Sequence, residues 1–283
     1  MTIALVFIGA VALAAVAIAA LGRAPWSFRA EFRRDVAAAL AAPRAAVAMV
    51  TEADLAPLPA AVQRYLRFVG VVGKPRVWNY RVRFRGRMRN GPGSAWMRIT
   101  ARQRSFVEPA ARLFYITASM LGVPAVAYHR YVGPSATFRV RLLSLLTVVD
   151  AEGPEMDRGE TVTLFNDMCL LAPATLIDPG IAWQELDPER VRATFTNAGH
   201  TVAAELAFDE SGALVDFTSD DRSRTADGKR YERLRWSTPV RAWRDFGGVR
   251  LAAHGDACWD APAGRFAYAE FDILSVEYNT SDL

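Results

Sequence analysis

The feature that most constrains the fold of this chain is a two-residue alternation of side chains that begins at Val77. Apolar and polar side chains alternate along the next dozen positions. The apolar face holds Trp78, Tyr80, Val82, Phe84, Gly86 and Met88, and the polar face holds Asn79, Arg81, Arg83, Arg85, Arg87 and Arg89. Successive side chains of a β-strand point to opposite faces, so this pattern predicts a long strand with one buried face. The NGPG sequence at 90–93 then predicts a turn into a second strand.

The same alternation recurs along most of the remaining chain. Further strands are predicted over residues 94–107, 111–118, 124–132, 135–142, 145–151, 181–187, 190–197, 201–208, 213–221, 230–236, 240–246, 249–259 and 265–278. Short turn signals separate them, and hairpin-length connections in series predict an antiparallel meander. So many strands must curl, because a flat open sheet of that size would expose its edges. The predicted fold is mainly β (α+β), with a large curved antiparallel sheet or an unclosed β-barrel.

The N-terminal segment carries no charge between Thr2 and Gly22. About 20 apolar residues suffice to cross the core of a bilayer. A cleavable signal peptide normally starts with a basic region, which this segment lacks, so an uncleaved transmembrane helix is favoured and cleavage stays open. The arginines that follow the segment are Arg23, Arg29, Arg33 and Arg34. By the positive-inside rule, they place the C-terminal body in the cytoplasm.

We therefore expect a single-pass membrane protein with three parts. These are a transmembrane anchor over 1–22, a juxtamembrane helix and linker over 23–54, and an antiparallel β domain with helices over 55–283. In the second part, residues 25–44 predict a short amphipathic helix at the membrane surface, with Trp26 and Phe28 near the interface. A second helix is predicted over 59–69, followed by Gly70 as its terminator.

Four acidic residues crowd into positions 152–160, just before an apolar run. Asp157 and Glu160 have the spacing of a capping box, in which the two side chains bond to each other's backbone amides. We interpret the cluster as the start of a helix over 158–171. The alternative is a carboxylate-based enzyme site at Glu155 and Asp157. No histidine lies within twenty residues of the cluster, which favours capping.

Charge is distributed unevenly along the chain. The net charge is +4, yet twelve basic and no acidic residues lie between Asp54 and Glu108, so the remainder carries −8. Arginines of the first strand either pair with acids across the sheet or contact anionic lipid headgroups near the anchor. The arginines are Arg81, Arg83, Arg85 and Arg87, and the acids considered are Glu270, Asp272 and Glu205. Pairing is favoured, and the predicted anchor and the acidic remainder argue against nucleic acid as a partner.

Sequence motifs for catalysis, cofactors or metals are lacking. The chain has no G-x-S-x-G, phosphate-loop, G-x-G-x-x-G or H-E-x-x-H motif. His129, His200 and His254 stand apart from one another and are interpreted as structural. Cys169 and Cys258 are 89 residues apart in apolar surroundings, which favours two buried thiols over a disulfide. We expect no catalytic residue, no cofactor and no metal.

Five segments carry a resemblance to a known family. They are RLFYITASMLGVP (112–124), GPEMDRGETVTLFND (153–167), FTNAGHTV (195–202), YERLRWSTPV (231–240) and FGGVRLAAHGDACW (246–259). Together they resemble a bacterial domain-of-unknown-function family whose members often carry an N-terminal membrane anchor. The resemblance covers roughly residues 55–280 and implies neither an activity nor site residues.

The predicted fold is in turn similar to the LolA/LppX-like group of lipoprotein and lipid carriers. In that group an unclosed barrel surrounds a hydrophobic cavity, and helices plug its open side. The analogy implies that the helices at 158–171 and 59–69 are plugs. It also implies an exported protein, in conflict with the cytoplasmic side given by the charge rule.

These observations favour a membrane-anchored, non-catalytic protein that binds a lipid or another apolar ligand on the concave face of the sheet, with a lipid or lipoprotein as partner. The candidate ligand-binding residues are Trp78, Tyr80, Phe84, Trp96, Phe114, Met120, Phe165 and Met168. Two alternatives stay open: the carboxylate-based enzyme, and a structural or interaction domain with a fully packed interior.

Overall fold

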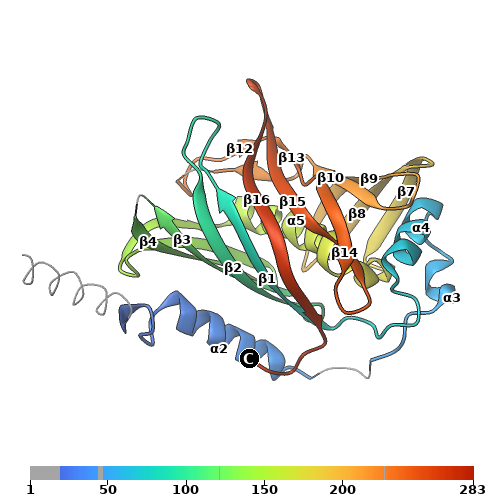
Figure 1. Ribbon diagram of the computed structural model, residues 1–283, viewed down its shortest axis with the longest axis horizontal. Coiled ribbons are helices and arrows are strands. Elements are labelled where there is room, and N and C mark those ends of the chain that lie inside the picture. Colours follow the sequence, from blue (N-terminus) through green and yellow to red (C-terminus); the bar gives the residue numbers. More distant parts are fainter. Residues whose placement is uncertain (1–19, 44–46, 121, 226) are drawn as a thin grey trace, which may run out of the picture.

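The computed structural model describes residues 20–43, 47–120, 122–225 and 227–283. The transmembrane helix predicted over 1–22 falls almost wholly outside these residues. Of the helices that are described, none combines the length and the apolar character needed to cross a membrane. Most of the described chain forms one curved antiparallel sheet, shaped as a trough, with helix α5 (Pro154–Leu171) lying against its concave side (Figure 1).

The main sheet contains fourteen strands in the order β6-β5-β4-β3-β2-β1-β16-β15-β13-β10-β9-β8-β7, with β14 also paired to β15. Their bounds are β1 Asn79–Met88, β2 Met97–Phe106, β3 Ala111–Met120, β4 Val123–Val132, β5 Ser135–Leu142, β6 Leu146–Glu152, β7 Ile181–Asp187, β8 Arg190–Asn197, β9 His200–Phe208, β10 Leu214–Ser219, β13 Arg235–Ser237, β14 Val240–Asp245, β15 Arg250–Ala261 and β16 Gly264–Tyr278. Within the described chain, the outer strands β6 and β7 do not pair, so the barrel stays open. The predicted mainly β class and the curved antiparallel sheet are confirmed.

Two meanders make up this sheet, and they join where the first strand pairs with the last. At the join Tyr80 stands opposite Tyr278, and Met88 stands opposite Ala269. A glycine is required there, because a Cβ atom on Gly86 would lie 2.1 Å from the carbonyl oxygen of Glu270. The strand predicted over 230–236 is instead split. Its first half, β12 (Glu232–Arg233), pairs with β11 (Ser223–Arg224) in a separate small hairpin.

Helix α2 (Phe28–Leu40) covers part of the convex face of the sheet. It begins after Ser27, whose hydroxyl accepts a hydrogen bond from the amide of Ala30 at 3.2 Å. The amphipathic helix predicted here is confirmed, but its apolar face packs on protein. Phe28 is 1% exposed and lies against Tyr128 of β4, which corrects the expectation that it sits at a membrane interface.

Two further helices precede the sheet. The short α3 (Glu52–Leu55) begins with a capping box between Thr51 and Asp54. Helix α4 (Ala60–Val69) ends at Gly70 in the left-handed conformation, as predicted. Its Tyr65 is fully buried and donates a hydrogen bond to the carbonyl oxygen of Cys169 in α5 at 2.7 Å. Helix α4 therefore packs against the C-terminal part of α5.

Helix α5 connects the two outer strands of the sheet, β6 and β7, and 13 of its 18 residues are buried. At 1.5 Å per residue it is about 27 Å long, enough to cross the trough. The predicted capping box is wrong. The helix starts one turn earlier, after Gly153 and with Pro154 in its first turn, a position that suits proline because no amide hydrogen is needed there. Asp157 and Glu160 consequently lie inside the helix.

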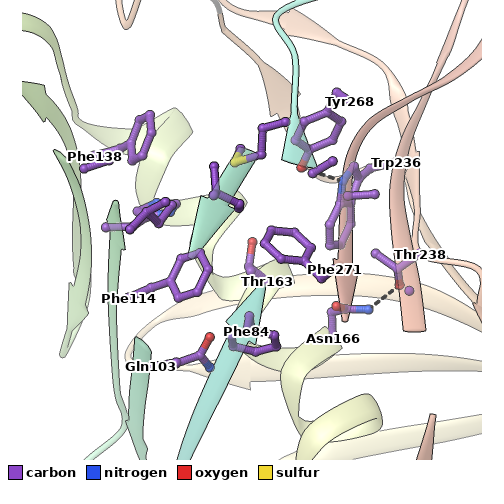
Figure 2. A pocket seen from close by; sticks show the side chains of 18 of the residues that line it. Phe84, Gln103, Phe114, Phe138, Thr163, Asn166, Trp236, Thr238, Tyr268 and Phe271 are labelled. Carbon is purple, nitrogen blue, oxygen red and sulfur yellow. Dashed lines mark hydrogen bonds between the residues drawn. The ribbon is translucent and has the colours of Figure 1, made fainter. Parts of the chain in front are cut away.

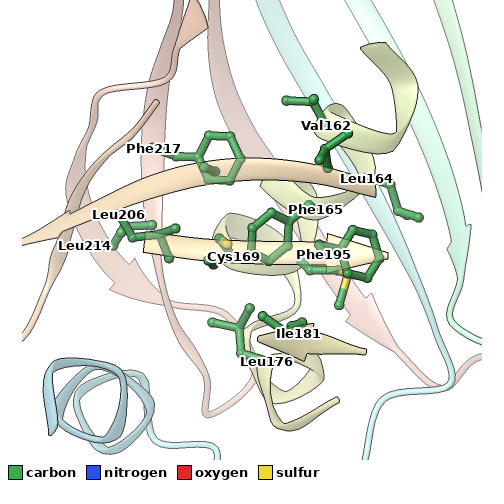
Figure 3. Packing of buried hydrophobic residues seen from close by; sticks show 14 of the residues in the cluster. Val162, Leu164, Phe165, Cys169, Leu176, Ile181, Phe195, Leu206, Leu214 and Phe217 are labelled. Atoms are coloured by element: carbon green, nitrogen blue, oxygen red, sulfur yellow. The ribbon is translucent and has the colours of Figure 1, made fainter. Parts of the chain in front are cut away.

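The core of the molecule forms where α5 meets the second meander (Figure 3). The rings of Phe165 and Phe195 stack at 5.1 Å, and Phe217 meets Phe165 edge-on at 5.5 Å. The short 3-10 helix η1 (Pro173–Ile177) adds Leu176 to the same cluster. Cys169 is buried here as a free thiol, and so is Cys258 on β15, which confirms the interpretation of both cysteines. This end of the trough is filled.

Candidate functional site

The other part of the trough holds a cavity of about 400 Å³ between α5 and the concave face of the sheet. A volume of this size falls in the range of pockets that hold small molecules. Its walls are mostly apolar and aromatic (Figure 2). The large side chains that line it are Phe84, Met88, Met97, Phe114, Phe138, Trp236, Trp259, Tyr268 and Phe271.

Three phenylalanines from three strands form the centre of the apolar wall. Phe84 of β1 lies 5.8 Å from Phe114 of β3 and 5.7 Å from Phe271 of β16, measured between ring centroids, and all three pairs are edge-to-face. Each occupies an inward position of its strand, so the two-residue alternation places all of them on the concave face. Contacts of this kind hold the rings in fixed orientations.

The cavity reaches the surface of the molecule. Its lining includes Asn90, in the loop between β1 and β2, and Val148 on β6, and both are exposed. Arg224 and Gly228, from the segment that follows β10, line it as well. The opening therefore lies between the β1–β2 loop, this segment and the outer strand β6.

A buried charged group interrupts the apolar wall. Arg112 of β3 donates from Nε to Oδ2 of Asp167 at 2.6 Å and from Nη1 to Oε2 of Glu160 at 3.0 Å. Gln103 of β2 donates to the same Asp167 oxygen at 2.7 Å. All four side chains are buried. Pairing and hydrogen bonds of this kind offset the cost of burying the charges.

Burial and pairing shift the pKa values of this group in different directions. Burial raises the pKa of Asp167 above its ordinary value, against the opposing effect of Arg112. Burial would also raise the pKa of Glu160, but His129, Arg112 and Arg222 together hold it below its ordinary value. Burial lowers the pKa of His129 to about 4, so its ring is neutral near pH 7.

Two nitrogen atoms of the cavity wall lack a hydrogen-bond partner among the described residues: Nε2 of His129 and Nε of Arg222. His129 Nε2 lies 3.1 Å from Oε1 of Glu160, but the two do not meet in hydrogen-bonding geometry. Arg222 donates from Nη1 to the hydroxyl of Tyr268 at 3.0 Å, and its guanidinium lies 4.5 Å from the centre of the Trp236 ring. Because buried polar atoms without partners are costly, this wall is suited to a polar group of a ligand.

The eight side chains predicted to bind a ligand are distributed over several environments. Phe84 and Phe114 line the cavity. Tyr80 is buried deeper in the same apolar cluster, whereas Phe165 and Met168 belong to the filled core. The remaining three lie elsewhere: Trp78 packs in the cluster beneath α2, Trp96 stacks with Arg87 and Arg89, and the side chain of Met120 is outside the described part.

The arginines of β1 pair with acids of β16, as the favoured interpretation predicts. Arg85 bonds to Asp272 at 3.1 Å and Arg87 to Glu270 at 2.7 Å. Arg81 pairs with Glu277 at 2.6 Å. Two residues depart from this pattern: Arg83 stands opposite Ser275, and Glu205 lies 3.9 Å from Arg192 instead of an arginine of β1. Contact of this strip with lipid headgroups stays a prediction.

The acids of the alternative enzyme site, Glu155 and Asp157, do not line the cavity, and both have structural partners. Oδ1 of Asp157 accepts a hydrogen bond from the amide of Ala136 at 2.6 Å, and Glu155 accepts one from the hydroxyl of Ser223 at 2.7 Å. Both contacts attach α5 to neighbouring segments. This geometry explains the two acids without a reaction.

One group with the spacing of metal ligands occurs in the described chain, formed by His254, Asp256 and Glu270. These side chains already have partners. Asp256 pairs with Arg241 at 2.8 Å, Glu270 pairs with Arg87, and His254 hydrogen-bonds to Asp272 at 2.7 Å. The cluster is explained by ion pairing between strands.

Arg112, Gln103 and His129 were missed as site residues. A signal was present in the sequence, because each falls on the inward, apolar face of its strand, where a polar side chain stands out. Arg112 shares its face with Phe114 and Ile116. A charged residue at an inward position indicates a buried partner, although the sequence does not tell which one.

Three solved structures resemble this fold, each at low identity. A DUF1329 family protein from Desulfovibrio piger has a TM-score of 0.44 at 10% identity, over 79% of this chain and 94% of that one. A putative outer membrane lipoprotein-sorting protein domain from Vibrio parahaemolyticus has a TM-score of 0.41 at 9% identity, over 72% and 87%. A LolA superfamily protein from Nitrosomonas europaea has a TM-score of 0.37 at 10% identity, over 83% and 96%.

Sequence comparison is more decisive than these structural likenesses. No curated protein matches the chain. One family matches most of it, over residues 48–271. This range includes α4, α5, all of the cavity lining except Ile273, and every strand of the main sheet except the last residues of β16. The chain therefore belongs to the family of unknown function DUF6544.

Proposed function

We propose that this protein binds a lipid, with an apolar chain of the lipid in the cavity between α5 and the sheet. The observation that carries the proposal is the cavity itself, about 400 Å³ with phenylalanine, methionine and tryptophan walls, beside a core that is otherwise well filled. Protein interiors are usually close-packed, so an apolar space of this size calls for an occupant. A purely structural domain would be expected to fill it.

The polar part of the wall supports a ligand with one polar group. His129 Nε2 and Arg222 Nε are buried and have no partner among the described side chains. A hydroxyl, ester or carboxylate oxygen placed beside them would accept a hydrogen bond from Arg222 and satisfy that nitrogen. The apolar chain would then lie against Phe84, Phe114 and Phe271.

The energy available from such a chain is sufficient for useful affinity. Burial of a methylene group contributes about 0.8 kcal/mol, so about ten of them contribute about 8 kcal/mol, which corresponds to a micromolar Kd before the costs of ordering the ligand. Residues 1–22 would keep the protein at a membrane, where such ligands are found. Residues 23–54 would then be the connection and 55–283 the binding domain.

A cavity-filling variant tests the proposal. Ala127 lines the cavity from β4 and is buried, so Ala127→Phe should occupy the space that the ligand needs. Ala182→Phe, at an exposed position of β7, is the matched control. We expect the full chain and the control to bind a fluorescent fatty acid and to retain lipid detectable by native mass spectrometry, and Ala127→Phe to lose both.

The thermal stability of the variants separates blocking from unfolding. Because Ala127→Phe adds apolar surface to an empty space, it should leave the melting temperature unchanged or raise it while removing binding. Equal binding of the fatty acid by a folded Ala127→Phe variant and by the unchanged protein would refute the cavity as the binding site.

A further inference from the structure

Exposed apolar side chains gather at one end of the sheet. Eleven large apolar side chains are exposed in the described chain, and five of them lie at this end. We call them the apolar rim: Trp26, Val123, Leu145, Leu146 and Val148. Leu146 and Trp26 are each 63% exposed. Single exposed apolar residues are ordinary on a protein surface, but a cluster marks a contact.

Hydrogen bonds hold the segments of the rim together. Arg141 of β5 donates from Nη1 to the carbonyl oxygen of Trp26 at 3.2 Å, which fixes the chain before α2 beside the end of β5. The amide of Leu143 donates to the carbonyl oxygen of Pro124 at 2.8 Å and joins the β5–β6 turn to the start of β4. These bonds place the three segments that carry the rim beside one another.

The β5–β6 turn at the rim has an unusual sequence for its shape. Leu143 and Ser144 both have positive φ angles, 53° and 60°. Where both central residues of a tight turn have positive φ angles, Asn-Gly is favoured, because a branched or bulky side chain is strained in the left-handed region. Here the sequence from 142 to 146 is LLSLL. Leu145 and Leu146 are exposed and Leu142 and Leu143 are half-buried, so apolar side chains at a strained turn meet water, which indicates an apolar partner for this tip.

The path of the chain favours a lipid bilayer as that partner. Helix α2 begins at this end of the molecule, and the uncharged stretch from Thr2 to Gly22 precedes it in the sequence. Arg23 and Arg29, both exposed, follow that stretch, and arginine beside an apolar segment suits anionic headgroups. Tryptophan is the side chain most typical of the boundary between membrane and water.

We propose that the apolar rim inserts into the surface of a lipid bilayer. Val148 belongs both to the rim and to the lining of the cavity, so the opening of the cavity then faces the membrane. A lipid chain could pass between bilayer and cavity without crossing water. The contact with the bilayer stands independently of ligand binding, whereas this route for the lipid rests on the proposed function.

Fluorescence quenching on the full chain tests the contact. Leu146→Cys is labelled with an environment-sensitive dye, and Leu274→Cys and Leu186→Cys are the controls, because both positions are exposed leucines outside the rim. The native thiols, Cys169 and Cys258, are buried and should react slowly. Each protein is reconstituted into vesicles of phosphatidylcholine and phosphatidylglycerol that carry a nitroxide-labelled lipid. A second sample of each is exposed to iodide in the water phase.

We expect nitroxide lipid to quench the dye at position 146 several-fold more than at 186 or 274, and iodide to quench it less. Equal nitroxide quenching at all three positions would overturn the proposal. Protection of position 146 from iodide without nitroxide quenching would also overturn it, because the rim would then face protein. Since the readout is the position of the dye, a cavity that binds no lipid would leave the result unchanged.

Discussion

Removal of the buried guanidinium of Arg112 should destabilise the fold strongly. Arg112 is 5% exposed and holds Asp167 at 2.6 Å and Glu160 at 3.0 Å, both of which are also buried. In Arg112→Met the methionine keeps much of the apolar stem, but Asp167 loses its charge partner and Glu160 loses its nearer one, with Arg222 left at 3.9 Å. Breaking a buried ion pair in this way costs about 3–5 kcal/mol. Because whole domains are stable by about 5–15 kcal/mol, this is a large fraction of the total.

The loss of stability should appear as a lower melting temperature. A chain of this size loses about 2–4 °C per kcal/mol, so Arg112→Met should melt about 6–20 °C lower. The first control is Arg87→Met, which breaks the half-exposed pair with Glu270 and should cost less than about 1 kcal/mol. Urea unfolding of the full chain, followed by circular dichroism, gives the free energy of unfolding for each variant.

A triple variant separates the loss of charge pairing from the loss of packing. Arg112→Met, Glu160→Gln and Asp167→Asn together remove the buried charges but keep the shapes of the side chains. If unpaired charge causes the destabilisation, the triple variant should recover most of the stability that the single variant loses. A triple variant as unstable as Arg112→Met, or a single variant that loses less than about 1 kcal/mol, would refute this reasoning.

Two further predictions concern pH and the join between β1 and β16. His129 faces Glu160 of α5, Arg112 of β3 and Arg222, and burial lowers its pKa from 6.5 to about 4. As the pH falls, His129 is therefore protonated in the unfolded chain at a higher pH than in the folded protein. The free energy of unfolding should therefore fall by about 2 kcal/mol between neutral pH and about pH 5. Urea titrations at the two pH values measure this fall, which should be absent in His129→Gln. Gly86→Ala should cost about 1–3 kcal/mol in thermal unfolding, because its Cβ meets the carbonyl of Glu270, whereas Gly93→Ala, in open space, should cost little; equal effects would contradict the close approach.

The strands were predictable because their signals are local. In β1 the alternation from Tyr80 to Met88 and the turn after it determine which face is buried, whatever the rest of the chain does. The pairing of Arg85 with Asp272 could also be predicted, since one strand is rich in arginine and a distant strand is rich in acids. That β1 should pair with β16 required knowledge of the whole topology.

The start of α5 was mispredicted because two local signals competed. Asp157 and Glu160 match a capping box, yet Gly153 and Pro154, four residues earlier, begin the helix. Tertiary contacts decide between the two. Asp157 accepts a hydrogen bond from the amide of Ala136, and Glu160 accepts one from the buried guanidinium of Arg112. Neither partner is near in sequence, so the pattern of the helix alone does not reveal them.

The difference between filled core and cavity is likewise set by α5. Phe165 and Phe114 are equally apolar and equally inward, but Phe165 stacks on Phe195 in the core whereas Phe114 faces open space. Sequence patterning distinguishes inside from outside. It does not give the distance between a helix and the sheet on which it packs, and that distance decides whether a phenylalanine touches protein or a ligand.

Polar contacts of α5 determine that distance. The helix is buried almost all round, so apolar packing alone would allow it to slide or turn within the trough. Two contacts hold it from different sides: Asp167 bonds to Arg112 of β3, and Asn166 donates to the hydroxyl of Thr238 at 2.6 Å. A buried ion pair adds little stability relative to apolar side chains in its place, although removal of one partner alone is costly, so its main effect is to specify the arrangement. The charged group at the cavity wall thus has a role even without a ligand, since it attaches α5 to β3, the strand that carries Phe114, and so fixes where the helix lies over the cavity.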